Sequence, residues 1–148
     1  MKKVTIFGGG TGMSTLLKGL KEFPLDITSV VSVCDDGKST GKLRKEFNIP
    51  AMGDIRRVMI SLSETEPLME KLLNYRFSSN SELNEHTAGN LLLTAGTQIT
   101  GNLSDGIKSI GKVLNLKGKV IPFSEDNIVL SAIMEDGSIV NGEHYITE

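Results

Sequence analysis

The chain has 148 residues, which is enough for one domain with a substantial hydrophobic core. Its 16 basic and 18 acidic residues leave a formal net charge of −2, which argues against nucleic acid as a partner, because broad nucleic-acid binding requires a clustered basic face. One cysteine, Cys34, excludes a disulfide framework, and with no membrane-spanning apolar run and no signal-peptide pattern we expect a cytoplasmic protein.

The first predicted strand, residues 4–7, runs directly into a glycine-rich loop. Four glycines occupy the five positions 8–12, and an apolar helical pattern begins at Met13. Glycine lets a ligand approach the backbone closely, and the unpaired N–H groups of a helix N-terminus favour a phosphate. The loop therefore predicts a phosphate or diphosphate ligand, with a tight turn that binds nothing as the alternative. The candidate contacts are Gly9, Gly10, Thr11 and Gly12.

The loop does not complete the dinucleotide-binding pattern G-x-G-x-x-G. Counted from Gly8 or from Gly10, the third glycine is replaced by Met13 or by Thr15. That glycine normally allows the helix and strand to pack closely. NAD is therefore a less favoured ligand than another nucleotide diphosphate.

The remaining predicted elements alternate between strands and helices. A helix carries apolar residues between 13 and 20, a buried strand covers 27–34, and a hairpin turn at Asp136-Gly137 separates 128–134 from 139–146. Between them we expect helices over 54–62, from Pro67, from near Thr87 and from Ser104-Asp105, followed by a strand over 119–123. The pattern predicts an α/β class: a Rossmann-like, three-layer α/β/α domain over residues 1–148, with a mostly parallel open sheet and a C-terminal β-hairpin.

An acidic segment follows the second predicted strand. Asp35 and Asp36 lie where a Rossmann protein holds a ribose hydroxyl, and they precede Lys38 and Ser39. Acids beside basic and hydroxyl residues also suit a metal–diphosphate group, which makes Asp35 and Asp36 candidate ligands for Mg²⁺. A solvated surface loop is the third interpretation. A P-loop is rejected, because its first glycine is replaced by Ser32.

Two further motifs contribute candidate residues. Asp54 complements the dipole of a predicted helix, whereas Arg56 and Arg57 in the same turn oppose it, which is more typical of an anion-binding site. His86 and Asn90 stand four positions apart at the start of the most apolar helix, on one face. His86 is the candidate general acid or base should the protein be an enzyme, and a capping or surface role is its alternative. His144 has no partner pattern and is interpreted as a surface residue.

Taken in order, the motifs resemble the bacterial gluconeogenesis factor family, a relative of 2-phospho-L-lactate transferase. The motifs are the glycine loop 8–12, Asp35-Asp36-Gly37, Gly53-Asp54-Ile55-Arg56, and His86 with Gly89-Asn90-Leu91-Leu92. The resemblance implies a cytoplasmic, Rossmann-like regulator that binds UDP-sugars such as UDP-N-acetylglucosamine and supports gluconeogenic growth and cell morphogenesis. It also implies that the glycine loop cradles the diphosphate and that Asp35, Asp36, Asp54, Arg56, His86 and Asn90 border one crevice.

The resemblance leaves several functions open. The acidic segment departs from the family pattern at Lys38, Thr40 and Lys42, and the chain matches only the N-terminal half of a longer family domain. A missing half would leave a sheet edge and apolar surface open, which favours a homo-oligomer. A non-enzymatic UDP-sugar-binding regulator is the leading hypothesis. A metal-dependent transferase acting on a nucleoside diphosphate is the second, and an NAD(P)-dependent oxidoreductase is the third.

Overall fold

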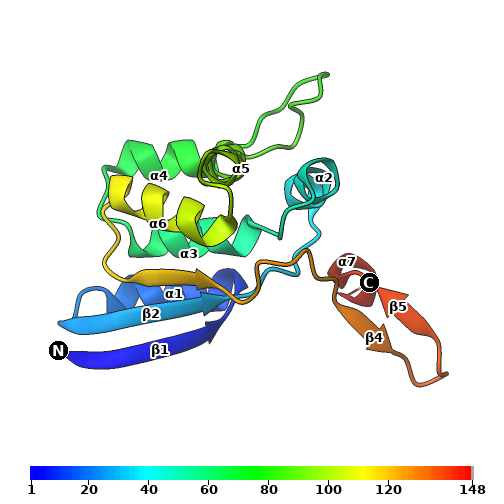
Figure 1. Cartoon of the computed structure of the whole chain (residues 1–148), viewed down its shortest axis with the longest axis horizontal. Helices are drawn as coiled ribbons and strands as arrows, with labels where there is room; N and C mark the ends of the chain where they lie inside the picture. Colours follow the sequence, from blue (N-terminus) through cyan, green and yellow to red (C-terminus); the bar gives the residue numbers. More distant parts are fainter. Residues whose placement is uncertain (148) are drawn as a thin grey trace.

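A parallel sheet of three strands organises the fold. The computed structural model describes residues 1–147 and orders the strands β1-β2-β3, with β1 at Lys2–Gly8, β2 at Leu25–Val31 and β3 at Lys119–Pro122 (Figure 1). Phe7 pairs with Val30, which in turn pairs with Ile121, so the three strands end at the same edge. The predicted α/β class with a parallel sheet is confirmed.

The glycine loop joins β1 to the first helix, α1, over Gly10–Leu20. Met13 and Leu17 are the buried residues of this helix, as their four-residue spacing predicts. The helix begins at Gly10, three residues before the apolar pattern, because glycines at its start leave no apolar signal in the sequence. Gly10 has a φ of +68°, a conformation that glycine adopts without strain.

Four helices form the layers above the sheet: α3 (Gly53–Leu62), α4 (Pro67–Asn74), α5 (Ala88–Thr100) and α6 (Leu103–Val113). Pro67 occupies the first position of α4, where its missing N–H costs nothing. Thr87 caps α5 by accepting a hydrogen bond from the Asn90 amide at 3.3 Å. Asn102, and not Ser104-Asp105, is the N-cap of α6, because its side chain accepts from the Asp105 amide at 2.8 Å.

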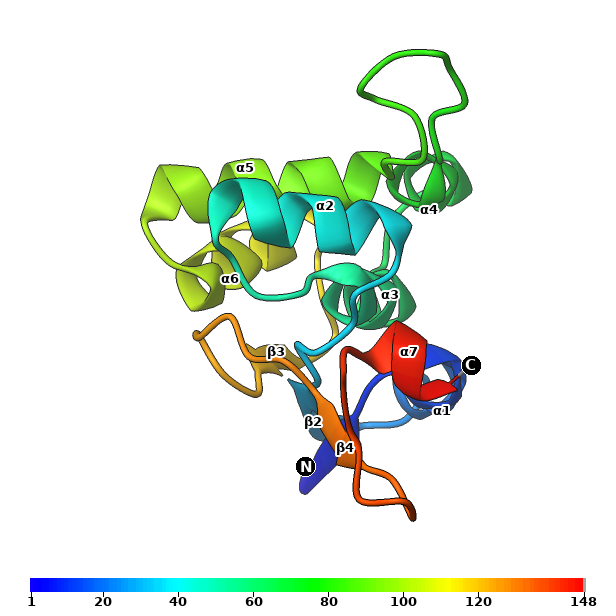
Figure 2. The ribbon, with the colours of Figure 1, turned by 90° about the vertical axis from the view of Figure 1, so that its right-hand side faces the viewer.

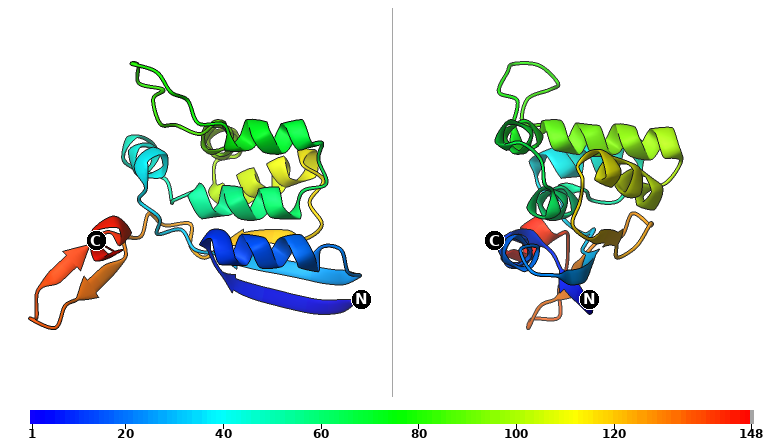
Figure 3. Two further views of the ribbon diagram at one scale, coloured as in Figure 1. Left: turned by 180° about the vertical axis from the view of Figure 1, so that it is seen from behind. Right: turned by 90° about the vertical axis from the view of Figure 1, so that its left-hand side faces the viewer.

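These helices lie on one side of the sheet. Helix α1 packs against α3, and α3 contacts β2 and β3, so the side views show the helical layers on the same side (Figures 2 and 3). Ile27 and Val31 of β2 point into this core and are buried. On the opposite face Phe7 is 72% exposed and Ile121 44% exposed. Residues 1–147 contribute no helical layer to that face.

Two segments differ from the sequence expectation. Residues 38–47, one of whose interpretations was a surface loop, form helix α2 (Lys38–Phe47), with Leu43 and Arg44 buried. The predicted hairpin is present as β4 (Ser131–Ile133) and β5 (Ile139–Asn141), but the second strand ends early. Positive φ at Gly142 turns the chain into a short helix, α7 (Glu143–Thr147).

No helix among residues 1–147 combines the length and the apolar composition that crossing a membrane requires.

Candidate functional site

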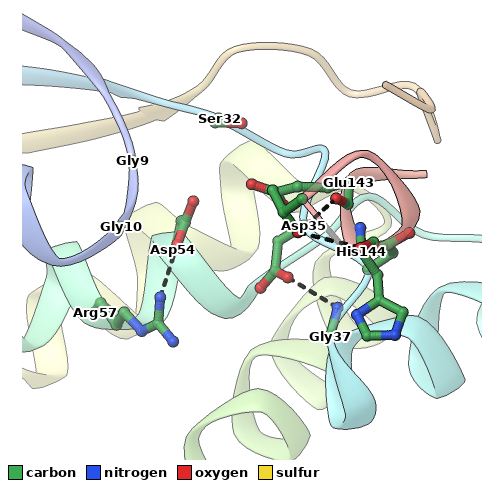
Figure 4. A pocket seen from close by; sticks show the side chains of 11 residues that line it. Gly9, Gly10, Ser32, Asp35, Gly37, Asp54, Arg57, Glu143 and His144 are labelled. Atoms are coloured by element: carbon green, nitrogen blue, oxygen red, sulfur yellow. Dashed lines mark hydrogen bonds and ion pairs between the residues drawn. The ribbon is translucent and has the colours of Figure 1, made fainter. Parts of the chain in front are cut away.

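A cleft of about 480 Å³ opens where β1 and β2 end (Figure 4). In open α/β sheets, ligands bind outside the carboxyl ends of the strands, so the position of this cleft is typical of a binding site. Its lining comes from the glycine loop, the segment after β2, the start of α3 and helix α7. The residues are Gly9, Gly10, Ser32, Asp35, Asp36, Gly37, Asp54, Arg57, Glu143, His144 and Thr147.

Glycines pack directly against the carboxylates of the cleft. A β-carbon at Gly9 would lie 2.4 Å from Asp54 Oδ2, and one at Gly53 would lie 2.4 Å from Asp35 Oδ2. Real side chains do not approach so closely, so any other residue at either position would displace the acid beside it. The structure therefore brings together the glycines and the acids that the sequence predicted. Because these glycines have no side chain, carboxylates of the same chain can pack against them.

Asp54 lies at the N-terminus of two helices. It is in the first turn of α3, and the backbone amide of Gly10, at the start of α1, lowers its pKa. Arg57 Nη1 donates a hydrogen bond to Asp54 Oδ1 at 3.2 Å. Burial, followed by the charge of Asp35, outweighs these effects and raises the pKa of Asp54 above its ordinary value.

The second group of acids combines two distant parts of the chain. Carboxylate oxygens of Asp35, Asp36 and Glu143 lie within 4.8 Å of one another. Burial, and then repulsion from Asp35, Asp54 and Asp36, raises the pKa of Glu143. Carboxylate oxygens are the ligands that Mg²⁺ and Ca²⁺ prefer, and a cation there would relieve the mutual repulsion. The residues present therefore fit a hard divalent cation.

The acidic segment is held in shape by local hydrogen bonds. The Gly37 amide donates to Asp35 Oδ1 at 2.9 Å, and the His144 amide donates to Asp36 Oδ1 at 2.9 Å. A β-carbon at Gly142 would lie 2.6 Å from Asp36 Oδ2. Asp35 is thus fixed within its own segment, whereas Asp36 is fixed by a residue 108 positions away, a pairing that no local sequence pattern contains.

Lys38 and Ser39 follow the acids in sequence, but they point elsewhere. Lys38 Nζ forms an ion pair with Glu85 Oε1 at 2.7 Å and its side chain is largely exposed. Ser39 is buried, and its hydroxyl lies 3.1 Å from His86 Nδ1. Neither residue lines the cleft.

His86 and Asn90 belong to a buried junction between α2 and α5. Asn90 Nδ2 donates to Ser39 Oγ at 3.2 Å and to Thr40 Oγ1 at 3.4 Å. His86 is 7% exposed, so its ring does not reach the cleft surface. A β-carbon at Gly53 would lie 2.9 Å from Thr40 Oγ1 and 2.4 Å from Asp35 Oδ2, so Thr40 connects the buried junction to the acids of the cleft.

Arg56 and Arg57 diverge although they are adjacent. Arg56 is buried, donates to Asn74 Oδ1 at 3.0 Å, and packs its stem beside Gly89. Burial is the largest of the effects that lower its pKa to about 10. Arg57 faces the cleft instead. In the sequence, both arginines indicated an anion-binding site because they oppose the helix dipole, but the family motif contains only Arg56.

Thr11 and Gly12 lie on the exposed side of α1, outside the lining of the cleft. Thr11 borders a separate hollow of about 210 Å³ between α1, α3 and α4, which shares Arg57 with the cleft. Of the loop residues predicted as ligand contacts, Gly9 and Gly10 are thus the two that line the cleft.

Ser32, Gly37, Arg57, Glu143, His144 and Thr147 were absent from the predicted site residues, although they line the cleft. His144 was interpreted as a surface residue; its side chain is exposed, and it also stands at the mouth of the cleft (Figure 4). Gly142, directly before Glu143 and His144, was the one signal in the sequence that the second strand of the hairpin ends there.

Comparison with known proteins identifies relatives of the whole chain. The family described as 2-phospho-L-lactate transferase CofD matches residues 4–148. The chain is 54% identical over 145 residues to a protein from Halalkalibacterium halodurans named gluconeogenesis factor, covering 98% of this chain and 45% of the relative. The protein of the same name from Bacillus subtilis is 51% identical over 146 residues, covering 99% of this chain and 46% of the relative.

A crystal structure of a Bacillus halodurans protein has the same fold. It superposes with a TM-score of 0.95 at 52% identity, over 99% of this chain and 47% of the other. The chain therefore spans less than half the length of the relatives that it matches, and the predicted match to the N-terminal half of a longer family domain is confirmed.

Proposed function

The chain belongs to the 2-phospho-L-lactate transferase CofD family, and from that premise we propose that it is the diphosphate-binding half of a UDP-sugar-binding regulator. The name of the relatives supports a role in gluconeogenesis. UDP-N-acetylglucosamine is the ligand proposed, and a role in cell morphogenesis and a cytoplasmic location are part of the same proposal.

One observation carries this proposal: the glycine loop and the acidic segment meet at a single cleft. Gly9 and Gly10 bring backbone amides and the N-terminus of α1 to the lining, and these groups favour an anion. Helix α1 has no side-chain cap hydrogen bond at Gly9, but the Gly10 amide already interacts with Asp54, so a ligand would share this N-terminus with that carboxylate. Arg57 adds a positive charge to the lining, which also favours an anion.

A divalent cation resolves the conflict between a diphosphate and four carboxylates. Asp35, Asp36, Asp54 and Glu143 would repel a bare diphosphate, whereas Mg²⁺ bound by the acids would attract it. We therefore propose that nucleotide binding requires a divalent cation. The cation would supply charge neutralisation, while the amides of the loop would orient the phosphates.

A second candidate, a metal-dependent transferase, is favoured by the acids beside the loop and by the family description. His86, the candidate general acid or base, is buried behind the cleft and does not line it. The regulator hypothesis therefore comes first, with an enzyme as the alternative.

Calorimetry with UDP-N-acetylglucosamine, GDP and NAD, each with Mg²⁺ and with EDTA, tests the proposal. We expect Mg²⁺-dependent binding of the UDP-sugar, and we expect Asp36→Asn to weaken it about tenfold or more, because charge-assisted contacts contribute roughly 1.5–3 kcal/mol. Asp105→Asn, in the first turn of α6, is the control. Preferential binding of NAD, or binding that EDTA does not change, would contradict the proposal.

The open face of the sheet supports the further proposal that the chain associates with itself. Phe7 and Ile121 are both exposed there, in register on either side of Val30. Sedimentation of the chain should give a dimer or a larger assembly, and Phe7→Ser should shift it toward monomer. Sedimentation of the unchanged chain as a monomer at all concentrations would exclude this association.

A further inference from the structure

The C-terminal arm, defined as residues 124–147, reaches the cleft from beyond the sheet. Its hairpin and α7 pack against each other and project away from the helical layers (Figure 1). Near its start, Glu125 accepts hydrogen bonds from the Leu103 and Ser104 amides at the beginning of α6. At its far end, the His144 amide binds Asp36. The arm is therefore attached at its two ends.

Arg44, in the last turn of α2, lies between these attachments. Its Nη1 donates to the carbonyl oxygens of Cys34 and Asp35, each at 3.1 Å. Its Nε donates to Asn127 Oδ1 at 2.9 Å, and its Nη2 donates to the carbonyl oxygen of Ile128. One guanidinium therefore bonds both the acidic segment and the start of the arm, which are about ninety positions apart.

The chemistry of these bonds requires arginine. The side chain is 6% exposed, and within residues 1–147 it has no carboxylate within ion-pair distance, so its charge is met by backbone and amide oxygens. A planar guanidinium presents five donors in fixed directions, whereas a lysine ammonium is a compact charge at the end of a flexible stem. Lysine could not satisfy acceptors on both sides at once.

We propose that Arg44 is a positioning residue that fixes the arm against the acidic segment, and thereby holds Glu143 beside Asp35 and Asp36. Arg44 does not line the cleft. It acts by bonding the acidic segment and the arm, whose side chains line the cleft. Without its bonds, the arm keeps the hydrogen bonds of Glu125, the Asn127–Asn48 hydrogen bond, the packing of Ile128 on the core and the Asp36–His144 hydrogen bond, and these do not hold Glu143 beside the other two acids.

Hydrogen exchange of Arg44→Lys tests this proposal, because it reads the arm and the core separately. Amides of residues 142–147, including the His144 amide that binds Asp36, should exchange at least about tenfold faster, since a charge-assisted hydrogen bond contributes that much to a local equilibrium. Amides of α3 should keep their protection. Arg76→Lys is the matched control, because Arg76 Nη1 also donates to a backbone carbonyl, that of Glu85, far from the arm.

Unchanged exchange of residues 142–147 in Arg44→Lys would overturn the proposal. If exchange instead rises throughout the chain, Asn48→Ala serves as the control for Asn127→Ala, because Asn127 Nδ2 also donates to Asn48 Oδ1 at 3.4 Å and both variants lose that bond. Asn127→Ala then decides by any effect beyond that of the control, because of the two it alone removes an acceptor of Arg44. Faster exchange confined to the arm in that variant supports the proposal, and no change overturns it.

A second measurement rests on the proposed cation site. The affinity for Mn²⁺, followed by electron paramagnetic resonance, should fall severalfold in Arg44→Lys and stay unchanged in Arg76→Lys. Equal Mn²⁺ affinity in Arg44→Lys and the unchanged chain would contradict the positioning of Glu143. If the unchanged chain binds no Mn²⁺, the cation site fails, while the exchange experiment still decides the role of Arg44.

Discussion

The carboxylate of Asp54 occupies the space that a side chain on Gly9 would need: a β-carbon there would lie 2.4 Å from Asp54 Oδ2. The glycine loop and the start of α3 therefore fit together before any ligand binds. Asp54 also pairs with Arg57, so displacing Asp54 would disturb Arg57 as well, the only arginine or lysine among the residues that line the cleft.

Gly9→Ala should abolish binding of a nucleotide diphosphate while the protein stays folded, because the new methyl group displaces Asp54 from the cleft. Gly19→Ala is the control, since a β-carbon at this position on α1 would point into open space. Calorimetry gives the affinities, and circular dichroism the melting temperatures. Normal affinity in Gly9→Ala would remove the loop from the binding site.

The stability gained by replacing Asp54 with asparagine should depend on pH. A carboxyl group whose pKa is raised on folding stabilises the folded state below its unfolded pKa of about 3.8, and this contribution disappears as pH rises through the folded pKa. Asparagine is neutral throughout, so the melting temperature of Asp54→Asn, relative to the unchanged chain, should increase as pH rises from 4 toward neutrality in EDTA.

Asp136→Asn provides a control of opposite sign. Hydrogen bonds from Ser138 lower the pKa of Asp136, so its ionised form stabilises the folded state above pH 3.8 and that contribution is lost as pH falls. Its replacement should therefore lower the melting temperature at neutral pH and have less effect near pH 3. Parallel pH curves for Asp54→Asn and the unchanged chain would show that Asp54 is not destabilised by burial.

Arg56→Ala and Arg57→Ala should separate stability from binding. Arg56→Ala removes the hydrogen bond to Asn74 and leaves the buried carbonyl of Leu73 unpaired, at a cost of about 1–3 kcal/mol, which lowers the melting temperature by several degrees. Arg57→Ala removes a partly exposed ion pair worth roughly 1 kcal/mol or less, but it should weaken diphosphate binding about tenfold. The reverse assignment in melting and calorimetry would contradict this orientation of the two arginines.

His86→Ala should lower stability and weaken ligand binding without exposing any catalytic role. The change removes the hydrogen bond to Ser39 and leaves space between α2 and α5, at a cost of about 2–3 kcal/mol. Slow consumption of UDP-N-acetylglucosamine by the unchanged chain, lost in His86→Ala, would establish an enzyme instead.

The sequence identified the elements whose signals are local. Four glycines between an apolar strand and an apolar helix predicted the β1–α1 unit, and Pro67 and Thr87 marked the starts of α4 and α5. The order of four motifs was enough to indicate the family, since each motif is a short run of adjacent residues. Asp35 and Asp36 after β2, and Asp54 at the start of α3, belong to these motifs and were predicted as site residues for that reason.

Only the tertiary structure decided which side chains share the cleft. Adjacent helix residues point about 100° apart, so the packing of α3 against α4 and α5 determines that Arg56 is buried and Arg57 faces the acids. Glu143 joins Asp35 and Asp36 across more than a hundred positions, through an arm that Arg44 and Asp36 attach to the body. Local patterns contain no information about such contacts, because their free energy arises from burial and hydrogen bonds formed only after the chain has folded.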